Sequence, residues 1–511
     1  MNTPLVLIIL DGFGVTETPG GNPFFTAKMP FWKTLVSQYP YTTLSASGES
    51  VGLPKEQDGN SEAGHLNIGA GRVVLSDSLR ISKCINDGSF FENPQLINAV
   101  KHAKVQRSRF HIMGLVSGKQ SAHAQIEHLL ALITFARRHK LPKIFLHLFT
   151  DGRDAPPISA LGYLEELAKF LTDKEEINSI AGRFYAMDRK REWQRTEMVY
   201  NLLTLGHGLA SNSAFNAISK AYLRGETDEF IVPTVILNEK GRISARIKNN
   251  DSVIFYNLRS DRARQLTKPF VERGFEMTGG FKRKTVLKNL FFVTMTDFGL
   301  HLNNIHYAFP HERVVEPLPL ALSQFRQMYI AESEKFAHVT YFINGGYADP
   351  LAGEERIMVP SPDKANYEKT PKMGLPQIVK IICRSIKAKK YDFIAANFSN
   401  PDMIGHTGNI QAAVEALEYV DTSIKKIVNA TLAQNGTIVI TSDHGNIEEM
   451  IDFSTGNVDT KHSSNPVPFV IVNDTLKNIK LRKGTLADVA PTIMKIMNIP
   501  KSPGMSGKNL Y

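Results

Sequence analysis

Three short segments of the sequence supply aspartate or histidine side chains that suit a metal ion. Asp443 and His444 are adjacent, Asp402 and His406 lie four residues apart, and His462 follows in a Pro-rich loop. Carboxylate and imidazole ligands together suit Zn, Mn or Fe, and the lack of nearby cysteines argues against a structural thiolate site. A single Asp-His pair is more often a helix cap or a hydrogen-bonded surface loop. The metal prediction therefore depends on the three segments occurring together.

A serine between two glycines is the candidate nucleophile. Ser61 lies in residues 58–65, with Gly59 before it and Gly64 after it. A serine hydroxyl becomes a good nucleophile only when a base or a metal lowers its pKa. The alternative is that Ser61 is the N-cap of a helix with Glu62 in the first turn; both roles are compatible, because helix N-terminal amides can seat a phosphoryl group. Two metal ions beside this serine would clamp both oxygens of a phosphoryl displacement.

Arginines that could bind a small anion are concentrated in the middle of the chain. They form three groups, which are Arg153 with Asp154, Arg183 with Arg189, and Arg259 with Arg262. Guanidinium groups bind carboxylate and phosphate through paired hydrogen bonds, so several that converge predict a small, doubly anionic substrate. The alternative is surface ion pairing, which we favour for residues 190–192.

The metal-ligand candidates require strands whose ends meet at one edge of a sheet. Residues 5–10, 391–398 and 436–441 are apolar runs, each followed by a polar loop with an aspartate. Such runs are typical of strands covered on both faces, and ligands of open α/β sheets bind beyond the carboxyl ends of the strands. Amphipathic helices are predicted over 374–388 and 410–434. The fold class is therefore α/β, with three strand ends meeting at one site.

The middle of the chain repeats this design with arginines in the loops. Residues 145–149 and 252–258 are apolar and lead into arginine-containing turns. A chain of 511 residues exceeds what one hydrophobic core usually organises. We predict a discontinuous metal-binding domain with a parallel sheet, residues 1–77 and 311–511, and an inserted α/β substrate-binding domain, residues 78–310.

These motifs resemble those of the cofactor-independent phosphoglycerate mutases, a two-domain family of the alkaline phosphatase superfamily, over nearly the whole chain. The segments that carry the resemblance are residues 10–14, 59–65, 151–154, 182–189, 331–340, 400–408, 442–446 and 462–468. The resemblance implies an alkaline-phosphatase-like metal domain. It also implies interconversion of 3-phosphoglycerate and 2-phosphoglycerate, in glycolysis and gluconeogenesis, through a phosphoserine and without 2,3-bisphosphoglycerate.

The resemblance assigns roles to individual residues. One divalent ion, usually Mn²⁺ in this family, would be held by Asp11, Ser61, Asp443 and His444, and a second by Asp402, His406 and His462. Substrate contacts would be His123, Arg153, Asp154, Arg183, Arg189, Arg259, Arg262 and Lys335. Ser61 would be the nucleophile and Asp154 the base on the glycerate hydroxyl, with His123 as a candidate proton donor. Closure of one domain on the other would keep water from hydrolysing the phosphoserine.

Three positions depart from the family pattern. Gln125 stands where the family has a second histidine beside His123, Asp58 replaces a methionine near Ser61, and Tyr329 replaces a common arginine. The substitution at Gln125 weakens the role of His123 as a proton donor and suggests altered flexibility of its loop. None of the three belongs to the metal set, so we expect the chemistry to survive.

Composition excludes some classes of protein and leaves others open. Apolar residues at 42% and charged residues at 22% exclude disorder and fibrous repeats. Residues 78–310 carry 34 Lys and Arg against 22 Asp and Glu, so the whole excess behind the net charge of +10 lies in the predicted insert. We therefore favour a small anionic substrate over nucleic acid, for which the chain lacks a motif.

The remaining expectations concern compartment and assembly. Cys84 and Cys383 cannot form a disulfide framework, which predicts a reducing, cytoplasmic environment. No apolar run is long enough to span a membrane. The family precedent is a monomer. The competing enzyme class is a phosphomonoesterase, or a mutase for another phosphate ester, of the same superfamily.

Overall fold

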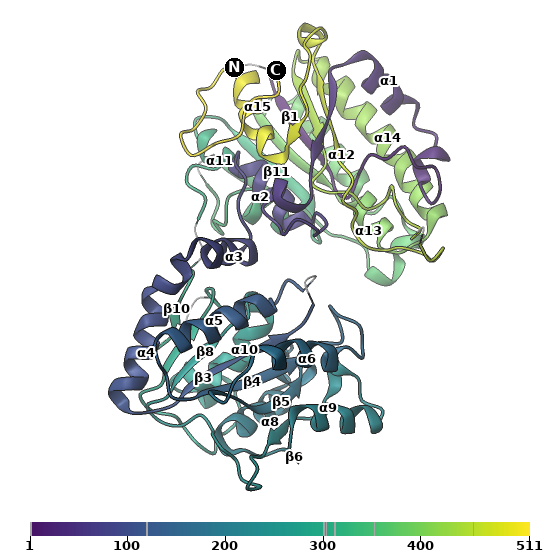
Figure 1. Cartoon of the computed structure of the whole chain (residues 1–511). Helices are drawn as coiled ribbons and strands as arrows, with labels where there is room; N and C mark the ends of the chain where they lie inside the picture. Colours follow the sequence, from purple (N-terminus) through teal and green to yellow (C-terminus); the bar gives the residue numbers. More distant parts are fainter. Residues whose placement is uncertain are drawn as a thin grey trace. The chain divides into compact units, whose positions relative to one another are not determined.

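The computed structural model of the chain describes residues 3–118, 121–299, 302, 304–310, 313–351, 353–452 and 454–511. The chain divides into two compact units. Unit 1 consists of Met1–Ser76 and Glu312–Tyr511, and unit 2 consists of Asp77–His311. Unit 2 is thus inserted into the sequence of unit 1, and each unit has a sheet of its own (Figure 1).

Unit 1 is built on an eight-stranded sheet. In sheet order its strands are β12 (Glu354–Val359), β11 (Gln327–Glu332), β13 (Phe393–Phe398), β1 (Leu5–Leu10), β14 (Thr437–Thr441), β15 (Val467–Val472), β2 (Tyr41–Ser45) and β16 (Gly484–Thr485). The five strands from β12 to β14 are parallel, whereas β15 pairs antiparallel with β14 and with β2. The predicted α/β class is confirmed, and the sheet is mixed rather than wholly parallel.

The two faces of this sheet carry separate cores because side chains of a strand alternate between faces. Val6, Ile8 and Leu10 of β1 belong to one buried cluster, and Leu5, Leu7 and Ile9 belong to the other. Helices α12 (Leu375–Lys387) and α14 (Ile410–Leu432) cover the first face, and α2 (Ser61–Ala70) and α15 (Val489–Ile496) cover the second (Figure 1). Burial of each such aliphatic side chain contributes about 1.5–3 kcal/mol. The rest of this unit's α-helices are α1 (Pro30–Gln38), α11 (Leu318–Ala321) and α13 (Asn400–Gly405).

Unit 2 is built on a second eight-stranded sheet. In sheet order its strands are β10 (His306–Tyr307), β9 (Phe291–Thr294), β8 (Ser252–Phe255), β3 (Phe110–Val116), β4 (Ile144–Thr150), β5 (Glu175–Gly182), β7 (Thr234–Ile236) and β6 (Leu209–Ser211). The pairs from β10 to β5 are parallel, and β7 is antiparallel to β5. Its α-helices are α3 (Asp77–Asp87), α4 (Pro94–Gln106), α5 (Ile126–Arg138), α6 (Ala160–Phe170), α7 (Arg183–Ala186), α8 (Trp193–Leu205), α9 (Ala214–Leu223) and α10 (Ser260–Val271).

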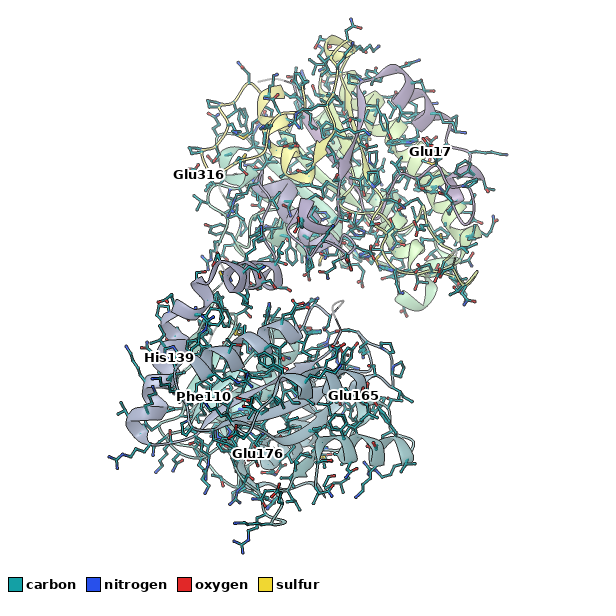
Figure 2. All side chains as sticks on the ribbon, in the orientation of Figure 1. Glu17, Phe110, His139, Glu165, Glu176 and Glu316 are labelled. Atoms are coloured by element: carbon teal, nitrogen blue, oxygen red, sulfur yellow. The ribbon has the colours of Figure 1, made fainter. Side chains whose placement is uncertain are left out.

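The side chains of unit 2 sort by burial as its sequence pattern requires. Phe110, at the start of β3, is buried among the strands, whereas Glu165 on α6 is exposed at the outside of the unit (Figure 2). One continuous hydrophobic cluster fills the unit. Because this apolar cluster fills the space between the sheet and its helices, we expect polar functional residues in the segments that follow the strands.

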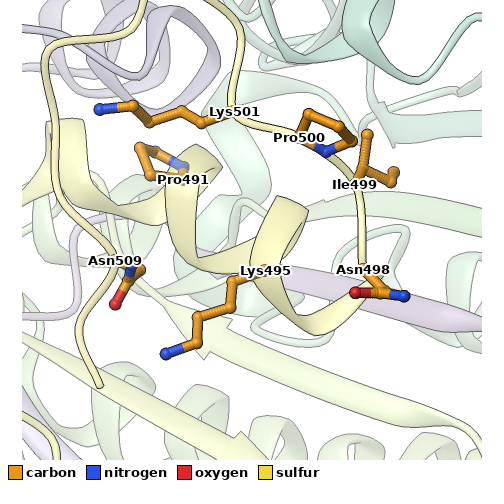
Figure 3. Close-up of a pocket in the computed structure, with 7 residues that line it drawn as sticks. All are labelled: Pro491, Lys495, Asn498, Ile499, Pro500, Lys501 and Asn509. Atoms are coloured by element: carbon orange, nitrogen blue, oxygen red, sulfur yellow. The ribbon is translucent and has the colours of Figure 1, made fainter.

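A pocket of about 400 Å³ lies near the C-terminus of unit 1 (Figure 3). Its lining includes Lys495 and Lys501, whose ammonium groups donate to the backbone carbonyls of Tyr511 at 2.5 Å and Gly507 at 3.1 Å. The first contact ties Tyr511 to α15 and the second closes the segment that follows this helix, so we assign the lysines a structural role. None of the helices described is long and apolar enough to cross a membrane.

Candidate functional site

The three aspartates singled out in unit 1 lie at the ends of three neighbouring strands. Asp11 directly follows β1, Asp443 follows β14, and Asp402 lies in the first turn of α13, after β13. The ends of β1 and β13 approach closely at Gly12, where φ is +69° and a Cβ atom would lie 2.8 Å from Asp402. The local sequence therefore places all three carboxylates at one edge of the sheet.

The first candidate metal group consists of Asp11, Asp443 and His444, all fully buried. His444 Nε2 lies 3.5 Å from a carboxylate oxygen of each aspartate, and its Nδ1 lies 3.2 Å from the carbonyl of Gly445. Burial alone would lower the pKa of His444, but the carboxylates of Asp443, Asp11 and Asp402 raise it to about 9. This group concentrates negative charge around one imidazole nitrogen.

The second candidate group consists of Asp402, His406 and His462. The Nδ1 atoms of His406 and His462 donate to the backbone carbonyls of Thr460 at 2.7 Å and Gly59 at 2.8 Å. A carbonyl can only accept, so each neutral imidazole carries its proton on Nδ1 and presents a lone pair on Nε2. The two Nε2 atoms lie 3.2 Å from each other and 3.3 Å from Asp402 Oδ1. Such a convergence of lone pairs and a carboxylate suits a divalent cation.

Ser61 contacts the first group from the start of a helix. It is the first residue of α2, and Asn60 is the N-cap, whose side chain accepts the N–H of Ala63 at 2.9 Å. The alternative that Ser61 itself caps the helix is therefore wrong. Ser61 Oγ lies 2.9 Å from His444 Nε2 and 3.2 Å from Asp11 Oδ1. The hydroxyl thus points into the cluster of acidic side chains.

Lys335 places a positive charge between the two groups. Its Nζ lies 2.7 Å from Ser61 Oγ, 2.7 Å from Asp11 Oδ1 and 2.6 Å from Asp402 Oδ2. Burial would lower the pKa of Lys335, but Asp11, Asp402 and Asp443 raise it above its ordinary value. For Asp402 the directions are reversed. Burial would raise its pKa, but Lys335 and the neighbouring histidines hold that pKa well below its ordinary value. The charged forms therefore stabilise one another inside the protein.

Three buried polar residues support this constellation and were not assigned a role from sequence. His65 lies 3.2 Å from Asp443, Asn397 donates to Asp11 Oδ2 at 2.5 Å, and Asn446 donates to Asp402 Oδ1 at 2.8 Å. His65 and Asn446 fall inside the motifs of residues 59–65 and 442–446. Their position within those motifs was the sequence signal that could have identified them as site residues.

The substrate-contact candidates of unit 2 lie beyond four neighbouring parallel strands. The loops after β3 and β4 carry His123 and Arg153 with Asp154, respectively. After β8, Arg259 is the N-cap of α10 and Arg262 lies in its first turn, and after β5, Arg183 is the first residue of α7. Arg189 follows α7, a few residues after Arg183. Lys335 is the one predicted substrate contact in unit 1. The structure thus gathers the other seven at one edge of the second sheet.

Asp151 organises this edge, although it was not predicted as a site residue. Its carboxylate accepts the backbone N–H groups of Arg153 and Asp154, both at 3.0 Å, and the hydroxyl of Ser117. It also pairs with Arg183 at 2.5 Å. These contacts fix the turn that presents Arg153 and Asp154.

Asp154 and His123 have opposite electrostatic settings. Asp154 lies 3.0 Å from Arg183 and 3.9 Å from His123 Nε2. Burial would raise the pKa of Asp154, but Arg183 lowers it below its ordinary value. Burial and Arg183 lower the pKa of His123 to about 4. Asp154 is thus ionised and His123 neutral at pH 7.

The outer arginines of this site pair with a second carboxylate. Arg189 lies 2.7 Å and Arg259 lies 3.8 Å from Asp261. Arg262 donates to the carbonyl of Met187 at 3.5 Å. Burial and three neighbouring arginines lower the pKa of Arg262. Arg189, Arg259 and Arg262 therefore share a region of positive potential that Asp261 partly compensates.

The three departures from the family pattern have different surroundings. Gln125 is buried and donates to the carbonyl of Ser121 at 2.9 Å, so it supports the loop of His123. Lys119 and Gln120 of that loop lie outside the described residues. Asp58 is half-buried, and burial raises its pKa while the nearby His462 opposes the shift. Tyr329 is fully buried in β11 and donates to Gln327 at 2.8 Å.

Comparisons with known proteins agree with this geometry. The chain matches the model of the Metalloenzyme superfamily over residues 3–501. It is 45% identical to the 2,3-bisphosphoglycerate-independent phosphoglycerate mutase of Clostridium botulinum (strain Langeland), covering 99% of both chains, and 44% identical to that of Moorella thermoacetica, covering 100% of this chain and 98% of the other. A solved structure described as Leishmania mexicana phosphoglycerate mutase at low cobalt concentration matches with a TM-score of 0.72 and 25% identity, covering 100% of this chain and 98% of that one. The chain therefore belongs to the Metalloenzyme superfamily and, within it, to the 2,3-bisphosphoglycerate-independent phosphoglycerate mutases.

Proposed function

We propose that this chain interconverts 3-phosphoglycerate and 2-phosphoglycerate without 2,3-bisphosphoglycerate, through a phosphoserine at Ser61. The observation that carries the proposal is the position of Ser61 Oγ, within 3.2 Å of Asp11, His444 and Lys335. A hydroxyl held between a carboxylate, an imidazole nitrogen and an ammonium can lose its proton and attack a phosphoryl group. The identity of the family supports the same reaction.

Two divalent metal ions fit the donor groups of unit 1. Asp11, Ser61, Asp443 and His444 would hold one, and Asp402, His406 and His462 the other. The facing Nε2 lone pairs of His406 and His462 carry this assignment, because without a cation or an added proton they repel each other. We propose Mn²⁺ as the metal, since oxygen and imidazole ligands suit it. When bound, the ions would supply Lewis acidity and neutralise charge on the transferred phosphoryl group.

The protein's own groups perform the transfer in two balanced steps. In the first step Ser61 Oγ gives up its proton and forms a bond to phosphorus while the bond from phosphorus to the glycerate oxygen breaks, and that oxygen takes up the proton, so that glycerate is left with a free hydroxyl. Lys335 Nζ, 2.7 Å from Ser61 Oγ, is placed to stabilise negative charge on the phosphoryl oxygens. After the glycerate reorients, its other hydroxyl gives a proton to Asp154 and takes the phosphoryl group back from Ser61. Ser61 Oγ then regains a proton and Asp154 loses one, which restores both groups to their starting state.

The arginines of unit 2 must retain glycerate between the two steps. Arg153, Arg183, Arg189, Arg259 and Arg262 offer paired donors to the substrate carboxylate and phosphate. If glycerate escaped, water would hydrolyse the phosphoserine and the protein would be a phosphatase. We propose that residues 78–310 are the substrate-binding domain and residues 1–77 with 311–511 the phosphoryl-transfer domain, so that turnover needs both.

We further propose that the protein works in the cytoplasm as a monomer, with a small molecule as its substrate. Cys84 and Cys383 are both unpaired, which suits a reducing compartment. The substrate and its product are small anions, and the basic excess of unit 2 suits them without a nucleic-acid partner.

The decisive test is an enolase-coupled assay on chelator-treated protein. We expect no turnover of 3-phosphoglycerate without metal, full turnover after Mn²⁺ is added, and no dependence on 2,3-bisphosphoglycerate. Release of inorganic phosphate at the rate of turnover would instead identify a phosphomonoesterase. Mass spectrometry of the quenched reaction should find phosphate on Ser61.

A further inference from the structure

A carboxylate that the proposed mechanism does not use lies behind the metal groups. Glu448 is buried, with 1% of its surface exposed, and it accepts four hydrogen bonds. The backbone N–H groups of Gly14 and Asn446 donate to Oε2, each at 2.9 Å. The hydroxyl of Ser463 and the side-chain amide of Asn465, at 3.0 Å, donate to Oε1. The structure pairs no Lys, Arg or His with Glu448 among the described residues.

The donors around Glu448 come from three loops, each of which carries a candidate metal ligand. One donor lies three residues after Asp11, one lies two residues after His444, and one directly follows His462. The loop of Gly14 lies 434 residues from Glu448 in the sequence, whereas the other two loops are close to each other near the end of the chain. A single side chain therefore joins the segments that present ligands from both metal groups.

The backbone at two glycines lies close to the carboxylate of Glu448. A Cβ atom at Gly14 or at Gly445 would collide with the Glu448 carboxylate. Gly445 also accepts the N–H of Ser463 at 2.9 Å. The carboxylate thus occupies the space that side chains at these positions would need, and larger residues there would push the loops apart.

Asn446 connects Glu448 to Asp402, the aspartate of the second metal group. Glu448 holds the backbone of Asn446 at 2.9 Å, and the side chain of Asn446 donates to Asp402 Oδ1 at 2.8 Å. Asn446 also packs against Gly405, where a Cβ would collide with it. A shift of the Glu448 carboxylate would therefore reach ligands of both groups.

We propose that Glu448 is a positioning residue that sets the geometry of both metal groups by holding their three loops together. The inference rests on the proposed metal sites. Both oxygens are needed as acceptors, because two donors converge on each. An amide in place of the carboxylate would turn N–H bonds toward two of these donors and leave them without an acceptor.

The test is Mn²⁺ binding to the full-length, chelator-treated protein, measured from the electron paramagnetic resonance signal of free Mn²⁺. We expect Glu448→Gln to raise the dissociation constants of both ions by about 10–100-fold, the usual effect of losing a residue that orients metal ligands. Circular dichroism should show that the variant is folded. Glu448→Gln with both constants within twofold of the wild type would overturn the inference.

A matched control is available in the same unit. Asp421 is a buried carboxylate that accepts the backbone N–H groups of Phe31 and Trp32 but touches no ligand loop. Asp421→Asn should leave both Mn²⁺ constants unchanged, even if it lowers the unfolding free energy. An equal loss of Mn²⁺ affinity in this control would also overturn the inference, because the effect would then be general destabilisation.

A second variant keeps the inference testable if Glu448→Gln fails to fold. Ser463→Ala removes the hydroxyl next to His462, which donates to Glu448 and accepts the N–H of Asn465 at 3.3 Å. We expect it to weaken binding of one of the two ions, that of Asp402, His406 and His462. Unchanged constants in this variant would count against the inference. If the wild type binds two Mn²⁺ ions but does not isomerise phosphoglycerate, the proposed function fails while the role of Glu448 stands.

Discussion

The two units present their functional side chains in contrasting ways. In unit 1, Asp11, Asp443 and His444 are fully buried and connected to residues from distant parts of the chain. In unit 2, the side chains of Arg153 and Arg189 are 56% and 53% exposed and pair with single carboxylates. The first metal group is thus fixed by burial and by hydrogen-bond networks, whereas Arg153 and Arg189 keep about half of their side-chain surface in water.

This difference matches two different tasks. A cluster of buried carboxylates must be rigid because it concentrates like charges that only cations can neutralise. If the arginines bind and release a substrate at each turnover, as we propose, they need partners that they can exchange, and exposed ion pairs are worth little. The predictions below test this division, beginning with the largest expected effect.

The largest effect should come from the nucleophile in the rigid unit. Ser61→Ala removes the attacking oxygen, so we expect mutase activity to fall by at least about 10⁴-fold. The aspartates and histidines of both groups remain, so Mn²⁺ binding should be largely retained. The enolase-coupled assay and Mn²⁺ titration measure the two quantities separately. Appreciable turnover by Ser61→Ala would refute the phosphoserine mechanism.

A smaller effect should separate a buried arginine from an exposed one within unit 2. The side chain of Arg183 is 2% exposed and pairs with Asp151 and Asp154, whereas that of Arg259 is 46% exposed. Arg183→Ala leaves two carboxylates without their partner, so we expect kcat/KM to fall by about 10²–10³-fold. Arg259→Ala should cost about tenfold, the value of one charge-assisted hydrogen bond to substrate.

The two variants test the contrast between buried and exposed groups directly. Arg183→Ala should also lower the unfolding free energy of unit 2, and Arg259→Ala should not. Equal losses of kcat/KM would show that burial does not decide the contribution of an arginine in this site. Steady-state kinetics and urea unfolding supply both measurements.

The convergence of the candidate metal ligands was predictable from sequence because these residues follow buried strands. The apolar run that forms β1 ends at Asp11, and the same design precedes Asp443 and Asp402. Parallel neighbours bring such ends together, so the pattern of each strand was sufficient. The arginine clusters were likewise visible, since Arg259 and Arg262 flank the start of α10.

What the sequence could not predict depends on pairing between distant residues. Glu448 contacts Gly14 across 434 positions, and nothing in the local pattern of either segment encodes that contact. The antiparallel direction of β15 follows from the path of its connecting loop rather than from its apolar composition. Asn60 was overlooked as the N-cap of α2 because its neighbour Ser61 is also a favoured cap residue.

A still smaller effect should come from the carboxylate that holds the exposed arginines. Asp261 lies 2.7 Å from Arg189 and 3.8 Å from Arg259, so it would compete for both with the anionic substrate of the proposed function. Asp261→Asn should free these arginines and lower KM for 3-phosphoglycerate by about threefold, less than the value of one full ion pair. Asp173→Asn, at an exposed position of the same unit, is the control. A rise in KM would show instead that Asp261 orients the arginines.

The last effect concerns stability and distinguishes the units by their response to acid. His111 and His147 are buried in the sheet of unit 2 and lie 3.0 Å apart through Nδ1 and Nε2. His111 Nε2 donates to Asp251 at 3.2 Å, so its Nδ1 accepts from His147, and His147 Nδ1 accepts from Ser179 at 2.8 Å. With both imidazoles neutral, every ring nitrogen of the pair therefore has a partner.

Burial lowers the pKa of His111 and lowers that of His147 well below 6.5. The unfolded chain therefore binds more protons than the folded one below pH 6.5, and the stability of unit 2 falls as the pH falls. Each histidine contributes about 1.4 kcal/mol per pH unit until its folded pKa is reached. His147→Gln should reduce the change in unfolding free energy with pH by the contribution of one histidine. Substitution of the exposed His207 should leave that pH dependence unchanged.

The two tryptophans of the sequence allow the units to be followed separately. Trp32 belongs to unit 1 and Trp193 to unit 2, so fluorescence of a Trp32→Phe variant reports unit 2 and that of Trp193→Phe reports unit 1. Urea unfolding of metal-free protein between pH 6.5 and 5 should shift the Trp193 transition toward lower urea. His147→Gln in the Trp32→Phe background should shift it less steeply. An identical slope with and without His147 would mean that the pair does not make unit 2 acid-sensitive, and that the contrast between the units is limited to their functional sites.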